Sequence, residues 1–176
     1  MFNVLNNLVS LARKKSDKME SALLQLSSLL RYMLYEGNQG RISLSQEVKY
    51  LQGYIDLQKL RFGDDVAIEF NVKGEVDEFK LEPMLLIPFV ENAFKHGMGT
   101  IENPSIRIDM EVIDNKLSFE VENDIPPVGE SKDVSSGIGL TNTKRRLDLL
   151  YQSLYNLRIS QKNQKHLVEL KLEMHD

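Results

Sequence analysis

The chain has 176 residues and a formal net charge of −4, a length that suits one compact domain with a helical appendage or two small units. A net negative charge supplies no positive electrostatic field that would bind nucleic acid, so nucleic acid is not an expected partner. Cysteine is absent, which excludes disulfide frameworks and thiolate metal sites, and no run approaches the roughly 20 apolar residues that a membrane-spanning helix requires.

Two amphipathic helices are predicted at the start of the chain. Apolar residues recur at helical spacing over residues 2–35. The glycine- and asparagine-containing segment 36–40 is expected to end this helix, because those residues accept the left-handed conformations found at helix ends. Ser43 and Gln46 form a capping-box pair, and a second apolar stripe continues from there to Phe62. The sequence therefore predicts a helical hairpin.

The apolar stripes of this hairpin exceed what two isolated helices can hide from water. We expect a second copy of the chain to pack against them, giving a homodimer through the N-terminal helices and a four-helix bundle. The alternative is that both helices pack on the C-terminal part of their own chain. The first stripe comprises Leu5, Leu8, Leu11, Ala12, Ala22, Leu23, Leu26, Leu29, Leu30, Met33 and Leu34.

After residue 65 the hydrophobic period changes from helical to alternating. Alternation predicts strands over 66–72, 106–112 and 117–121, with an Asp114–Asn115 turn between the last two. A closing hairpin is expected over 157–160 and 166–173. Helical patterns over 83–96 and 139–154 would cover the apolar face of the sheet. The predicted fold class is α+β, a two-layer α/β sandwich preceded by an α-helical hairpin, with the division after residue 62.

The helical segment 83–96 carries the first candidate site residues. Its apolar side chains would pack on the sheet, while one edge presents Asn92, Lys95 and His96. An asparagine carbonyl is a hard oxygen ligand that suits Mg²⁺, whose remaining ligands come from water and substrate phosphates. Lys95 would then face phosphate charge, and His96 would lie near a sugar. Taken singly, each residue also has a plain explanation as a surface, capping or solvated side chain.

A glycine pair opens the next predicted helix. Gly137 and Gly139 let backbone N–H groups approach a phosphate closely, and the helix that begins near Leu140 offers its positive end to an anion. By itself this pair is weak evidence, since a plain loop-to-helix entry also uses glycine.

Three further polar residues complete the candidate site. Asn123 ends a predicted strand, where its carboxamide oxygen would accept from the exocyclic amine of a base. Asn142 and Arg146 follow the glycines on the helix and would orient the loop or reach phosphate, although Arg146 equally suits a surface ion pair. Because these pieces occur in the order that one site requires, the sequence predicts a Mg²⁺–nucleotide site.

Several motifs occur together along nearly the whole chain: Phe2-Asn3-Val4-Leu5-Asn6, Leu29-Leu30-Arg31-Tyr32, Leu57-Gln58-Lys59-Leu60-Arg61-Phe62-Gly63, Pro88 to Gly97, and Gly137-Ile138-Gly139-Leu140-Thr141-Asn142 followed by Arg146-Leu147. In these the chain resembles the cytoplasmic part of LytS-like sensor histidine kinases. Their ATP-binding domain has the Bergerat (GHKL ATPase) fold that DNA gyrase and MutL share. The resemblance implies that residues 1–62 form a dimerisation and histidine-phosphotransfer hairpin and that residues 63–176 form an ATP-binding catalytic domain.

The resemblance also assigns roles at the site, with ATP and Mg²⁺ as cofactors. It implies that Asn92 is the Mg²⁺ ligand and that Asn123 recognises adenine, with residues 124–136 as the ATP lid. The other implied nucleotide-binding residues are Lys95, His96, Gly137, Ile138, Gly139, Leu140, Asn142 and Arg146. One departure from the family pattern concerns the adenine position. Most histidine kinases carry Asp there within a DxGxG motif, and the present Asn123-Asp124-Ile125-Pro126-Pro127 lacks both glycines.

The activity implied is transfer of the ATP γ-phosphoryl group to a histidine, from which a cognate response regulator takes it. We expect the acceptor histidine shortly before Phe2, because His96 belongs to the nucleotide site and His166 and His175 lie in or after the last strand. No certain catalytic residue is therefore predicted within the chain. The expected location is cytoplasmic, in a protein anchored in the cell inner membrane.

Two alternatives share part of this description. One is a serine kinase of the same fold, of the anti-sigma class, and the other is a non-enzymatic dimerisation module with a vestigial nucleotide site. Pro88 stands where ATP-hydrolysing relatives of the fold place a water-activating Glu, so weak ATPase activity is expected.

Overall fold

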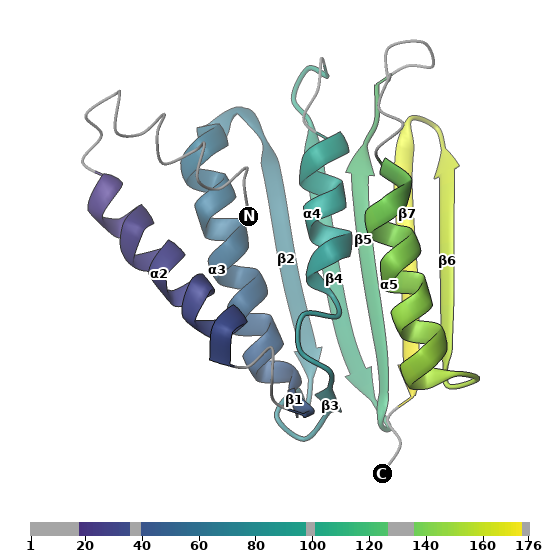
Figure 1. Cartoon of the computed structure of the whole chain (residues 1–176). Coiled ribbons are helices and arrows are strands. Elements are labelled where there is room, and N and C mark those ends of the chain that lie inside the picture. The colour runs from purple at the N-terminus through teal and green to yellow at the C-terminus, as the bar shows by residue number, and fades with distance from the viewer. Residues whose placement is uncertain (1–17, 36–39, 98–100, 127–135, 174–176) are drawn as a thin grey trace.

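The computed structural model of the chain describes residues 18–35, 40–97, 101–126 and 136–173. Helices cover one face of a β-sheet (Figure 1), which confirms the predicted α+β class. The elements in chain order are α2 (Met19–Tyr35), β1 (Ile42–Ser43), α3 (Leu44–Phe62), the 3₁₀ turn η2 (Gly63–Asp65), β2 (Ala67–Gly74), β3 (Lys80–Leu81), α4 (Ile87–His96), β4 (Ser105–Ile113), β5 (Lys116–Asp124), α5 (Ser136–Tyr151), β6 (Tyr155–Lys162) and β7 (Lys165–Glu173).

The main sheet has five strands in the order β2-β4-β5-β7-β6. β2 and β4 are parallel, and the other neighbours are antiparallel. Alternate residues face the helices, as the sequence alternation predicts. Met110, Phe119 and Leu170 lie side by side across three strands and are buried. The predicted turn at Asp114 and Asn115 is also confirmed, with positive φ angles of 49° and 60°.

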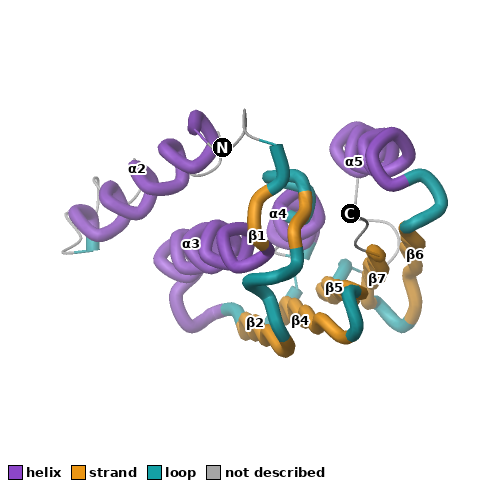
Figure 2. The backbone as a smooth tube through the Cα atoms, turned by 90° about the horizontal axis from the view of Figure 1, so that it is seen from below, coloured by secondary structure: helices purple, strands orange, loops and turns teal. Residues whose placement is uncertain are grey.

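The helix layer consists of α3, α4 and α5, and α2 lies outside it against α3 (Figure 2). Phe89 of α4 packs on Phe119 of β5, with ring centroids 6.2 Å apart. Leu51 and Ile55 of α3 are fully buried in the same hydrophobic core. The second helix of the predicted hairpin is thus part of the layer that covers the sheet, and α2 packs against it. The predicted domain division after residue 62 stays a prediction.

Helix boundaries differ from the predicted ones where tertiary contacts decide them. α4 begins at Ile87 rather than at residue 83, because Met84 adopts a left-handed φ of 59° that ends any helix. α5 runs from Ser136 to Tyr151, three residues earlier at each end than predicted. The pairing of β1 with β3, Ile42 opposite Leu81, was not predicted, since two-residue strands leave no periodic pattern.

Several predictions fall wholly or partly outside the described residues. They are the helix over residues 2–17, most of the 36–40 break and most of the predicted lid at 124–136. Among the described residues, no helix combines the length and hydrophobicity that crossing a membrane would need.

Candidate functional site

Three element ends meet at one end of the sheet, at the top of Figure 1: the C-terminal ends of α4 and β5 and the N-terminal end of α5. α4 packs on both β5 and α5. The predicted site residues Asn92, Asn123 and Gly139 belong to these three elements. Asn92 precedes Asn123 by 31 residues and Gly139 follows it by 16, and the fold brings the three elements that carry them to one place.

The exposed edge of α4 carries the predicted metal and phosphate residues. Asn92 and His96 are half-buried and Lys95 is exposed, whereas Ala93 and Phe94 are buried. Positions i, i+3 and i+4 share one helix face, so Asn92, Lys95 and His96 line up along α4. The opposite face supplies the apolar contacts with the sheet. The helix thus presents these three polar side chains because its packing uses the other side.

Asn123 is buried at the end of β5, with 1% of its surface exposed. Its Nδ2 donates to the carbonyl oxygen of Asp124 at 2.8 Å. Only the amide nitrogen can donate to a carbonyl, so this bond fixes the orientation of the carboxamide. Its Oδ1 is then an acceptor, and it has no hydrogen-bond partner among the described residues. A buried acceptor in that state calls for a donor, such as the exocyclic amine of adenine.

Gly97 allows the end of α4 to touch the end of β5. A Cβ added at Gly97 would lie 2.7 Å from the carbonyl oxygen of Ala93 and 3.1 Å from the Cβ of Asn123. No side chain fits in that space. Gly97 is the last residue of the motif that begins at Pro88. Glycine is needed there because β5 lies close to the end of α4, a contact that spacing along the chain does not reveal.

A polar network holds the strand ends around Asn123. Asp124 Oδ2 accepts from the backbone N–H of Ser105 at 2.8 Å and from its hydroxyl at 2.7 Å. Asp124 Oδ1 pairs with the ammonium of Lys165 at 2.8 Å. Burial raises the pKa of Asp124, but the Lys165 ammonium and the Ser105 donors outweigh it and leave the pKa below its ordinary 3.8. The charged network ties β4, β5 and β7 together beside the candidate site.

His166 is a site neighbour that the sequence did not reveal. It lies on β7 directly opposite Asn123, and 8% of its surface is exposed. Burial lowers the pKa of His166 below its ordinary 6.5, and the nearby His96 lowers it further. His166 therefore stays a neutral imidazole near α4. Only the register between β5 and β7 connects it to the site, since it follows Asn123 by 43 residues.

The N-terminal end of α5 contains the glycine motif. The backbone of Gly137 and Ile138 lies in its first turn, and Leu140 is half-buried while Asn142 is exposed. A Cβ added at Gly139 would meet nothing within 4 Å. Packing within the described residues therefore does not require glycine at position 139. Close approach of a ligand would require it.

Arg146 lies farther along α5, about 15 Å from Ser136 at 1.5 Å per residue. Its Nη2 donates to the carbonyl oxygen of Pro83 at 2.7 Å and its Nη1 to that of Met84 at 3.1 Å. Both acceptors belong to the loop before α4. Arg146 orients this loop, and the predicted contact with nucleotide stays a prediction.

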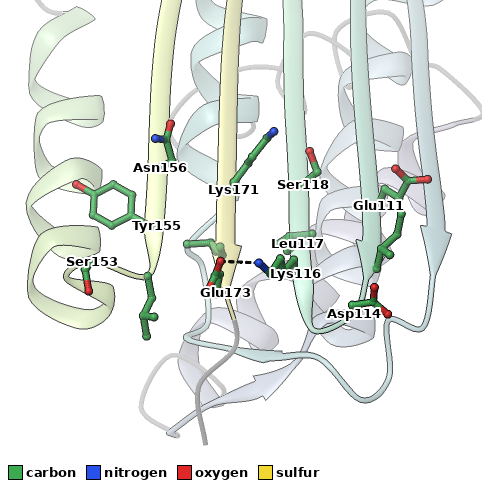
Figure 3. Close-up of a pocket in the computed structure, with 13 residues that line it drawn as sticks. Glu111, Asp114, Lys116, Leu117, Ser118, Ser153, Tyr155, Asn156, Lys171 and Glu173 are labelled. Carbon is green, nitrogen blue, oxygen red and sulfur yellow. Dashed lines mark ion pairs between the residues drawn. The ribbon is translucent and has the colours of Figure 1, made fainter.

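A cavity of about 740 Å³ lies at the other end of the sheet (Figure 3). Its walls come from the turn between β4 and β5, the end of β7 and the start of β6, and include Glu111, Tyr155 and Lys171. Lys116 Nζ and Glu173 Oε1 form an ion pair across it at 2.8 Å. None of the predicted site residues lines this cavity, so it is separate from the candidate site.

Comparison with known proteins gives one family and a group of relatives. The histidine kinase family model matches residues 1–66. Sensor protein LytS of Enterococcus faecalis is 30% identical over 164 residues, which covers 86% of this chain and 28% of that protein. Sensor protein LytS of Streptococcus agalactiae is 32% identical over 179 residues, with 90% and 29% covered. The chain thus spans less than a third of the length of these relatives.

Solved histidine kinases share the fold. Histidine kinase AdeS of Acinetobacter baumannii superposes with a TM-score of 0.55 at 14% identity, covering 99% of this chain and 95% of that chain. Histidine kinase ThkA in complex with response regulator protein TrrA gives a TM-score of 0.51 at 16% identity, with 92% and 51% covered. At these identities the likeness is one of fold.

Proposed function

Since the chain belongs to the LytS-like sensor histidine kinases, we propose that it supplies the ATP-binding catalytic region of such a kinase. In this role the site formed by α4, β5 and α5 binds Mg-ATP. The γ-phosphoryl group passes to a histidine, and a response regulator then takes it. The observation that carries the proposal is the buried Oδ1 of Asn123 at the C-terminal end of α4, which has no hydrogen-bond partner among the described residues.

The residues present fit an adenine nucleotide. Asn123 offers an acceptor whose neighbouring amide nitrogen is already bonded, which favours the amine of adenine over the carbonyl of guanine. The N-terminal end of α5 supplies backbone donors and the positive end of a helix dipole for phosphates. Open space at Gly139 lets a phosphate approach that backbone. The two ends of the nucleotide thus have complementary groups.

Asn92 would hold Mg²⁺ through its carboxamide oxygen, and Lys95 on the same edge of α4 would face the phosphates. When bound, the metal neutralises phosphate charge during transfer. Lys95 adds a second positive charge, and His96 lines the same face. Since the acceptor histidine is itself the nucleophile, these residues need only position and neutralise the phosphates.

Position 88 of α4 offers no base that could activate water. Pro88 lies in the first turn of the helix, one turn before Asn92. A proline offers no group that accepts a proton, so the site favours transfer to a histidine over hydrolysis.

Partners and location follow from the family proposal. α2 leaves Leu23, Leu30 and Leu34 exposed at 47%, 39% and 69%. We propose that a second copy covers this face, giving a homodimer through the N-terminal helices. A response regulator is the proposed partner for phosphoryl relay, since the solved kinase ThkA binds one. We place the chain on the cytoplasmic side of an anchored sensor protein, as its LytS relatives are named sensors.

The two alternative functions have less support. A serine kinase of the anti-sigma class would not account for the match of residues 1–66 to histidine kinases. A vestigial nucleotide site would supply no donor to the buried oxygen of Asn123, which finds none among the described residues.

Calorimetric titration with Mg-ADP tests the site. We expect wild-type protein to bind, Asn92→Ala to lose the Mg²⁺-dependent part of the affinity, and Gly139→Ala to bind more weakly because a methyl group enters the phosphate approach. Asn156→Ala is the matched control, because Asn156 is an exposed asparagine at the opposite end of the sheet (Figure 3). Equal Mg-ADP affinity in Asn92→Ala and Asn156→Ala would remove the basis of the metal assignment.

A further inference from the structure

Glu47 is a fully buried carboxyl group outside the candidate site. It lies in the first turn of α3 with 0% of its surface exposed. Three donors reach it: the N–H of Leu86 bonds Oε1 at 3.0 Å, and the N–H of Met84 and the hydroxyl of Tyr32 bond Oε2 at 2.9 and 2.8 Å. Burial raises the pKa of Glu47, and these donors oppose that effect. A buried carboxyl that accepts from the backbone just before α4 and from a side chain of α2 points to a positioning role.

The residues that Glu47 holds are the loop 83–86, here called the α4 seat. Glu47 accepts from two of its N–H groups, and Arg146 of α5 donates to two of its carbonyl oxygens, those of Pro83 and Met84. Met84 has a φ of 59°, a conformation that residues other than glycine keep only where their surroundings hold it. The opposed grip of Glu47 and Arg146 provides that hold. The α4 seat is thus fixed from α3 on one side and from α5 on the other.

The α4 seat sets the position of α4. Leu86 is the N-cap residue of this helix, and Asn92 follows Ile87 by five residues. α4 is one continuous helix of ten residues that begins directly at the seat. A change at the seat therefore reaches Asn92, Lys95 and His96 as a rigid shift. Because Arg146 stands on α5, the same change bears on the helix that carries Gly139.

Tyr32 connects the α4 seat to α2. Its ring stacks on Tyr50 of α3, with centroids 4.5 Å apart and planes 21° apart. Its hydroxyl shares Oε2 of Glu47 with the N–H of Met84. Two donors on one oxygen compete for the same charge. Withdrawal of the Tyr32 hydroxyl therefore alters the hold of Glu47 on the N–H of Met84.

We propose that Glu47 is a positioning residue for the nucleotide site and that Tyr32 makes its hold on the α4 seat depend on where α2 lies. This rests on the proposed nucleotide binding. α2 is also the helix whose exposed leucines are proposed to contact a second copy of the chain. A displacement of α2 is therefore transmitted through Tyr32 and Glu47 to Asn92, and nucleotide binding acts back on α2 to the same extent.

The decisive variant is Tyr32→Phe, which removes the hydroxyl and keeps the ring that stacks on Tyr50. Tyr35→Phe is the matched control, since Tyr35 lies on the same helix with 69% of its surface exposed. Mg-ADP affinity is measured by calorimetry, hydrogen exchange of the α2 amides is measured with and without Mg-ADP, and melting is followed in parallel. We expect Mg-ADP affinity to fall about fivefold in Tyr32→Phe, the lower end of typical couplings between sites. Nucleotide should change α2 exchange in wild type and Tyr35→Phe but not in Tyr32→Phe.

Glu47→Gln supplies a second route to the same answer. It should also weaken Mg-ADP binding, and in its background Tyr32→Phe should cost less than it does alone, because both changes act through one oxygen. Failure of wild type to bind Mg-ADP would overturn the proposed function, and this inference with it. If wild type binds Mg-ADP, the coupling alone would be overturned by a Tyr32→Phe variant that matches Tyr35→Phe in Mg-ADP affinity and in the exchange of the α2 amides. A Tyr32→Phe variant with a lower melting temperature but unchanged affinity and α2 exchange would overturn it as well.

Discussion

Asn123 illustrates how one hydrogen bond can decide what a residue recognises. Its amide nitrogen donates to the carbonyl oxygen of Asp124. Its own side-chain oxygen has no partner among the described residues and can accept a hydrogen bond from a ligand. Asp at the same position would have no N–H for that carbonyl. The departure from the family pattern therefore changes what holds the side chain in place, while it keeps an acceptor for the base.

His166 should give the fold a pH dependence near neutrality. Its folded-state pKa lies below the ordinary 6.5, so below pH 6.5 the unfolded chain binds a proton that the folded chain does not. The free energy of unfolding therefore rises with pH. The stability that the neutral His166 permits is fully present above about pH 6.5 and is lost as the pH falls through the folded-state pKa. We expect urea unfolding of the wild type to show this loss and His166→Gln to show less of it. An identical slope in both proteins would contradict the assignment.

At the scale of elements, α2 carries both buried and exposed leucines. Leu26 and Leu29 are buried against α3, whereas Leu34 is 69% exposed. Leu34→Asp should therefore leave the monomer folded and weaken the proposed dimer. Leu26→Asp should instead cost roughly 3 kcal/mol or more of stability, because it places a charge in the core.

Sedimentation over a concentration series measures the dimer, with thermal unfolding as the check on the fold. Wild type should shift from monomer to dimer with rising concentration, and Leu34→Asp should need more protein to do so. A wild type that is monomeric at every concentration would favour the alternative in which α2 serves only to cover its own chain.

Which elements could be predicted depends on how local their causes are. The strand alternation and the Ser43–Gln46 cap, where the Gln46 side chain accepts from the Ser43 N–H at 3.1 Å, arise from residues close in sequence. The start of α4 arises only partly from nearby residues. Apolar spacing favours a helix from residue 83, whereas Pro88 favours a start close to its own position. The opposed contacts of Glu47, 36 residues before Pro83, and Arg146, 63 residues after it, hold residues 83–86 out of the helix.

At the scale of the molecule, the proposed activity needs a histidine that the described site does not hold. The three histidines are His96 and His166 beside the nucleotide site and His175 after the last strand. Residues 1–176 incubated with Mg-ATP labelled on its γ-phosphate should therefore label themselves little and release little phosphate. A chain extended N-terminally through a histidine before Phe2 should carry an acid-labile, base-stable label, as a phosphoramidate requires. Self-labelling of residues 1–176 on Ser or Thr would favour a serine kinase.

The site as a whole was predictable only in its linear pieces. Asn92, Asn123 and Gly139 were identified because each stands in a motif with its own local chemistry. Gly97 beside Asn123 and His166 opposite it come from packing and from strand register, which depend on the order in which the strands assemble. No spacing along the chain specifies that order, so contacts between motifs had to come from the structure.

The strand order has a consequence for how the chain assembles. β4 with β5 and β6 with β7 are local hairpins, while the β5–β7 pairing closes across the whole of α5. Local pairings carry a smaller loop-closure cost and form early, so the docking of the two hairpins comes late. Asn123 and His166 face each other only after that docking. A ligand of this end of the sheet would therefore bind only the fully assembled chain, and by mass action it would stabilise that state against unfolding.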